Sequence, residues 1–160
     1  MTGSRVIAVF ALSLTVAGCA DADRIDVTTV LARGNCQTTD TGVKEIDYAT
    51  LAAYRGTRLL DMTESPESDA HPVHLVAIVP GEYPTPGYSL IIDGEPKIEA
   101  GELTITVRVN KPPPDAILAQ MITRPCLVVG VADPRVTRVR VVDDAAHSVG
   151  ELNLAPAKAP

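Results

Sequence analysis

The clearest pattern in the chain is the strict alternation of apolar and polar residues in ELTITVRV, residues 102–109. Alternation with a period of two gives the segment one apolar and one polar face, which predicts a half-buried strand. Two apolar runs, HLVAIV at 74–79 and CLVVGV at 126–131, predict further strands. More strands are expected at 88–92, 116–123 and 136–142.

The segments between these runs predict turns and one helix. Asp47 precedes YATLAAYR and Gly56 follows it, which is typical of a short helix with an N-cap and a C-terminal glycine. Residues 25–32 leave open whether a strand forms there. NKPPPD at 110–115 is not the interior of a strand, because proline lacks the N–H that a ladder needs.

Together these patterns predict a mainly β fold, a small antiparallel β-sandwich or barrel preceded by one short helix. We expect an N-terminal segment over 25–70, within which ESPESDA at 64–70 is an exposed loop or linker. The β domain is expected over 71–144 and a flexible tail over 145–160.

Residues 1–18 have the pattern of an export signal: Arg5, then the apolar stretch VIAVFALSLTV, then small residues. The stretch is shorter than the roughly 20 residues of a spanning helix. Val16-Ala17-Gly18-Cys19 resembles a bacterial lipoprotein box. This resemblance implies that Cys19 carries lipid and that residues 19–24 tether the domain to the cell envelope, facing the periplasm. Ala20 after the cysteine favours the outer membrane.

Two cysteines remain after Cys19, namely Cys36 and Cys126. An even number of cysteines in an exported chain favours a disulfide between them, and the alternative is two buried free thiols.

Charge and motifs exclude several classes of function. The net charge of −6 and the absence of a Lys/Arg run argue against nucleic acid as a partner. No nucleophile elbow, HExxH motif or phosphate-binding loop occurs, so we expect neither an enzyme, nor a cofactor, nor a small-molecule substrate. His71 and His74 form HPVH, which is far weaker than a metal-ligand pattern, so no metal site is expected.

GEYPTPGY at 81–88 predicts a rigid corner between two strands. Pro86 presets φ for the first centre of a type II turn and Gly87 supplies the positive φ of the second. Tyr88 is expected to begin a strand and pack under the turn, whereas the role of Tyr83 stays open.

From about Leu75 to Val142 the chain resembles the C-terminal domain of PrcB-type proteins, the protease-complex-associated lipoproteins. The resemblance rests on G-E-x-P-T-x-G-Y at 81–88, the alternating strand at 103–109, the proline-rich segment at 111–114 and A-Q-x-x-T-x-P-C at 119–126. It implies a small β-rich domain on an exported protein. More remotely, the corner is similar to the P-T-T-G-[YF] loop of chagasin-type cysteine peptidase inhibitors, and Arg124-Pro125 to their R-P-[WF] loop.

Two functional hypotheses follow. The first is a membrane-anchored, protein-binding module whose partner is an envelope protein, such as a peptidase, and the alternative is a chagasin-like inhibitor of cysteine peptidases. The residues expected to contact the partner are Tyr83, Pro84, Thr85, Pro86, Gly87, Tyr88, Arg124 and Pro125.

Overall fold

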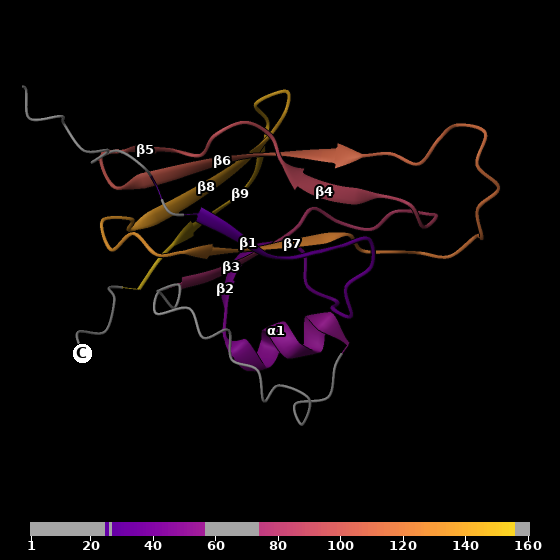
Figure 1. Cartoon of the computed structure of the whole chain (residues 1–160), viewed down its shortest axis with the longest axis horizontal. Coiled ribbons are helices and arrows are strands. Elements are labelled where there is room, and N and C mark those ends of the chain that lie inside the picture. The colour runs from indigo at the N-terminus through magenta and orange to yellow at the C-terminus, as the bar shows by residue number, and fades with distance from the viewer. Residues whose placement is uncertain (1–24, 26, 57–73, 156–160) are drawn as a thin grey trace, which may run out of the picture.

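The computed structural model describes residues 25, 27–56 and 74–155, which form two stacked β-sheets with a helix against one of them (Figure 1). The predicted signal peptide, Cys19 with its tether, and the linker at 64–70 lie outside the described residues. No helix within the described ranges is long and apolar enough to cross a membrane.

The first sheet has four strands in the order β1-β7-β3-β2, and all its neighbours are antiparallel. The strands are β1 (Val27–Arg33), β7 (Cys126–Val131), β3 (His74–Val79) and β2 (Gly42–Ile46). The second sheet has the order β4-β6-β8-β9. The short strand β5 lies outside this order and also pairs with β6. Its strands are β4 (Ser89–Ile92), β5 (Lys97–Glu99), β6 (Glu102–Asn110), β8 (Arg138–Asp143) and β9 (Ser148–Asn153).

The predicted mainly β class is confirmed, and the two sheets form an open sandwich without closing into a barrel. β6 and β8 pair in parallel, whereas the other pairs of the second sheet are antiparallel.

The main core lies between the two sheets. Val76 and Ile78 of β3 face it together with Leu103 and Ile105 of β6, and all four side chains are fully buried. Because β6 alternates, its other side carries polar residues, as the sequence predicts. The intervening residues of β3, such as Ala77, face away from this core towards a second one. β3 and β7 are therefore buried on both sides, which explains why their sequences are continuously apolar.

Helix α1 (Tyr48–Arg55) covers the outer face of the first sheet and forms the second core. Leu51 and Tyr54 are buried in it against β3 and β7. The predicted caps are confirmed. The Asp47 side chain accepts a hydrogen bond from the N–H of Thr50 at 2.7 Å, and Gly56 ends the helix with a φ of 68°.

Three expectations about strands need correction or completion. The strand expected at 116–123 is wrong: residues 116–122 are irregular and mostly exposed, because they pair with neither sheet, and Thr123 alone forms an isolated bridge. The tail expected to be loose over 145–160 contains β9, which pairs with β8 and is followed by the buried Leu154. The ambiguous segment at 25–32 is largely strand β1, and β2 and β5 had no clear signal in the sequence.

Candidate functional site

The segments 81–88 and 123–126, which contain the residues expected to contact a partner, meet at one end of the sandwich. Tyr83 and Thr123 form an isolated antiparallel bridge, in which each N–H donates to the other residue's carbonyl oxygen, at 2.8 and 2.9 Å. The buried hydroxyl of Thr123 also donates to the carbonyl oxygen of Thr85 at 2.9 Å. The structure thus joins two motifs that lie about 40 residues apart into one surface, called the corner below.

The tyrosines of the corner contact each other. The ring centroids of Tyr83 and Tyr88 lie 4.4 Å apart, with an angle of 32° between the ring planes. Burial and the neighbouring Tyr88 raise the pKa of Tyr83 above its usual value. Tyr88 directly precedes β4 and packs on Tyr83. The contact between the two rings therefore stiffens the loop, and both rings form part of the surface of the corner.

Gly87 has the positive φ predicted for it, 96°. A Cβ atom at this position would lie 2.8 Å from the Cβ of Pro112, which belongs to the proline-rich segment after β6. Glycine is therefore required both for the backbone conformation and for the close approach of a second loop.

Arg124 connects the corner to the loop between β1 and β2. Its guanidinium forms an ion pair with Glu82, and its N–H donates to Asn35 Oδ1 at 3.0 Å. Its carbonyl oxygen accepts a hydrogen bond from the N–H of Cys36 at 2.8 Å. The predicted disulfide is present and joins Cys36 to Cys126, which lies two residues after Arg124. Both cysteines are buried, so this bond holds the base of the corner in place.

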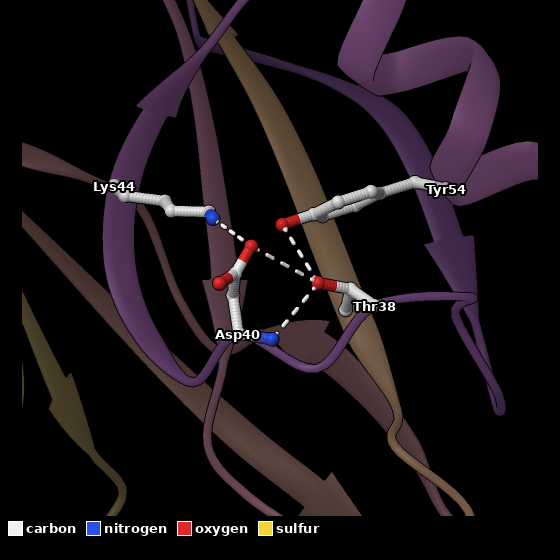
Figure 2. Close-up of polar contacts among 4 residues, drawn as sticks. All are labelled: Thr38, Asp40, Lys44 and Tyr54. Carbon is white, nitrogen blue, oxygen red and sulfur yellow. Dashed lines mark hydrogen bonds and ion pairs between the residues drawn. The ribbon is translucent and has the colours of Figure 1, made fainter.

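An open hollow of about 600 Å³ lies beside the corner, between the 35–40 loop, helix α1 and the segment that contains Ile122 and Arg124. Thr38, Asp40 and Tyr54 line it, and Figure 2 shows that their polar groups converge. The Thr38 hydroxyl lies 3.3 Å from Asp40 Oδ2 and 3.4 Å from the Tyr54 hydroxyl. The N–H of Asp40 donates to the Thr38 hydroxyl at 3.0 Å.

Lys44 of β2 completes this polar cluster through an ion pair with Asp40. The hydrogen bond from Lys44 lowers the pKa of Asp40, and the same bond raises the pKa of Lys44. Both groups are therefore charged at neutral pH. The cluster fixes the loop against the helix and gives the hollow hydroxyl, amide and carboxylate groups that can form hydrogen bonds with a peptide.

Sequence reasoning missed the most exposed apolar residues of this end. Ile117 is fully exposed, and Met121 and Ile122 are 51% and 60% exposed. They belong to the irregular connection between β6 and β7, which Figure 1 shows extending beyond the sheets. The only signal in the sequence was NKPPPD, which argues against a continuous strand before this segment.

The expected contact residues differ in their exposure. Pro84 and Gly87 are exposed, whereas Thr85, Pro86 and the side chain of Arg124 are half-buried. Pro125 is buried. Some of the expected residues thus build the site, and others form its outer surface.

The HPVH pair does not present two ligands in the described part of the chain. His71 lies outside it, and the buried His74 places Nδ1 2.6 Å from Glu45 Oε1 of β2. Among the described residues, no group of three or more His, Cys, Asp and Glu side chains could hold a metal ion.

The fold and the site together define a disulfide-linked β-sandwich domain with a stiff loop corner at one end. Residues 74–132 match the protein family described as PrcB C-terminal. This match, which runs from β3 to just past the end of β7, confirms the resemblance found in the sequence. No curated protein and no solved structure matches the chain at a significant level. The resemblance of the corner to chagasin-type loops stays a prediction.

Proposed function

We propose that this chain is a lipid-anchored protein of the cell envelope whose β domain binds another envelope protein, as a module associated with a protease complex. The observation that carries the proposal is the match of residues 74–132 to the PrcB C-terminal family, within which the corner is built. The rigidity of the corner supports a binding role, because a preformed loop loses little conformational entropy when it binds.

The direction of β1 suits an anchor at Cys19. β1 pairs with β7 so that Val27 lies opposite Val131 and Arg33 lies opposite Cys126. The chain therefore enters the first sheet at the end away from the corner, and the strand separates the two ends by about 20 Å. A lipid on Cys19 would therefore attach the chain at the end of the first sheet opposite to the corner, which leaves the corner free to contact a partner.

Membrane anchoring is tested by fractionation of cells that express the full-length chain or its Cys19→Ala variant. We expect the parent to stay with the membranes after a high-salt wash and the variant to be released, because the acyl chains are the proposed attachment. Retention of the variant on membranes would overturn the anchoring step.

Partner binding is tested by photo-cross-linking in cells. A photoreactive amino acid replaces Pro84, which is exposed on the corner, or Glu99, which is exposed on β5 at the other end. We expect a protein adduct from position 84 that position 99 does not give, and mass spectrometry then shows whether that protein belongs to a peptidase complex. Equal adducts from the two positions, or none from position 84, would refute binding at the corner.

A further inference from the structure

The connection between β6 and β7 carries an uncharged apolar segment that the sandwich does not use. Residues 116–123 read AILAQMIT, and the side chain of Ile117 is completely exposed. Exposing large aliphatic side chains to water is unfavourable, and adjoining exposed apolar residues commonly mark an interaction surface. We call residues 116–122 the apolar loop.

Both ends of the apolar loop are fastened to the folded domain. On the β6 side, Pro112 packs against Gly87, and the N–H of Ala116 donates to the carbonyl oxygen of Pro113 at 3.1 Å. On the β7 side, Thr123 bridges to Tyr83 and the disulfide follows at Cys126. The corner therefore supports the loop at its base, and the connection between β6 and β7 extends beyond the strands (Figure 1).

We propose that the apolar loop inserts into an apolar cleft of a partner protein, with Ile117 as its central contact. The inference rests on the proposed function, since it names the element by which the binding module holds its partner. A projecting convex element requires a concave partner, and a few buried apolar anchors commonly dominate the energy of such a contact. Ile122 also borders the polar hollow, so a protein held by the loop would have hydrogen-bonding groups of the domain beside it.

A protein fits the loop better than a lipid surface does. Residues 116–123 carry no cationic side chain to bind anionic headgroups, and the loop lies at the end of the first sheet opposite to Val27, where the chain enters. An anchor on Cys19 would thus attach the chain at the opposite end of the first sheet from the loop. The neighbouring hydroxyl and amide groups of the hollow match the hydrogen-bonding groups of a polypeptide.

The inference is tested by placing the photoreactive amino acid at position 117 of the full-length chain in cells, with position 99 as the control. We expect position 117 to give a protein adduct that position 99 does not give, and the cross-linked peptide of the partner to map to an apolar cleft. An adduct with a second copy of this chain, an adduct with lipid, or no adduct would overturn the inference. A protein adduct from position 84 without one from position 117 would refute insertion of the apolar loop but leave the proposed function intact. The absence of a protein adduct from both positions would refute the proposed function as well.

The protein identified in this way is then purified and titrated with the mature domain. We expect Ile117→Ser with Met121→Ser to weaken binding about tenfold or more, and Ile117→Leu to change it by less than about threefold, because leucine keeps the apolar volume. The same proteins are mixed with vesicles of phosphatidylethanolamine and phosphatidylglycerol. Unchanged affinity of the double variant for the protein, or binding of the parent to vesicles that the double variant loses, would refute insertion into a protein cleft. Thermal unfolding of each variant should match the parent, since neither Ile117 nor Met121 belongs to either core.

Discussion

The contact between Gly87 and Pro112 gives the sharpest test of how the corner is held. Replacing Gly87 by alanine imposes two costs. A φ of 96° is unfavourable for a residue with a Cβ, by about 1–2 kcal/mol, and the new Cβ would lie only 2.8 Å from the Cβ of Pro112. Relieving such an overlap by moving neighbouring atoms costs about 1–3 kcal/mol.

Gly94 is the matched control for this experiment. Its φ is 78°, also positive, but a Cβ there would have no atom within 4 Å. Gly94→Ala thus carries the backbone cost without the overlap, and both variants share the same effect of alanine on the unfolded chain. We expect Gly87→Ala to lower the free energy of unfolding by about 1–3 kcal/mol more than Gly94→Ala does.

Urea denaturation of the mature domain, followed by circular dichroism, measures these free energies. Pro112→Gly removes the opposing Cβ, so the extra cost of Gly87→Ala should largely disappear in that background. This double-mutant cycle isolates the overlap from the intrinsic effect of losing the proline ring. Equal losses for Gly87→Ala and Gly94→Ala, or an extra cost that persists without Pro112, would refute the packing of the two loops described above.

Three other predictions concern stability. Reduction of the Cys36–Cys126 bond, which closes a segment with a sequence separation of 90 residues, should lower the free energy of unfolding by up to about 4.6 kcal/mol in the chain-entropy model; equal urea midpoints for the oxidised and reduced parent would contradict it. Asp47→Ala removes the N-cap of α1 and should cost about 1 kcal/mol, with Asp47→Ser restoring most of the loss, as seen in urea titrations. Hydrogen bonds from Arg135 lower the pKa of Asp133 in the folded state. The ionised Asp133 therefore stabilises the fold at pH values above the pKa of the unfolded state, which is near 3.8. This stabilisation is lost as the pH falls through the lower pKa of the folded state. Thermal melts from pH 6 to pH 2 should therefore show a weaker acid dependence for Asp133→Asn, and identical acid profiles would rule out this contribution.

The sequence by itself determined the local features of this protein. Strict alternation marked β6, the continuous apolar runs marked β3 and β7, and Asp47 and Gly56 marked the ends of α1. These features are readable because they depend on neighbours within a few residues: side-chain periodicity, capping groups and the sign of φ at glycine.

The tertiary structure decided where these elements meet. It pairs Tyr83 with Thr123, places Pro112 against Gly87 and joins the loop at Cys36 to the start of β7. The sequence of 116–123 has the apolar character of a strand, yet residues 116–122 pair with neither sheet and form an exposed loop after a run of prolines. β9, with few apolar residues, becomes a strand because β8 offers it hydrogen bonds. The sequence of a segment shows which of its side chains are apolar. Only the folded structure determines whether another surface is available to cover those side chains.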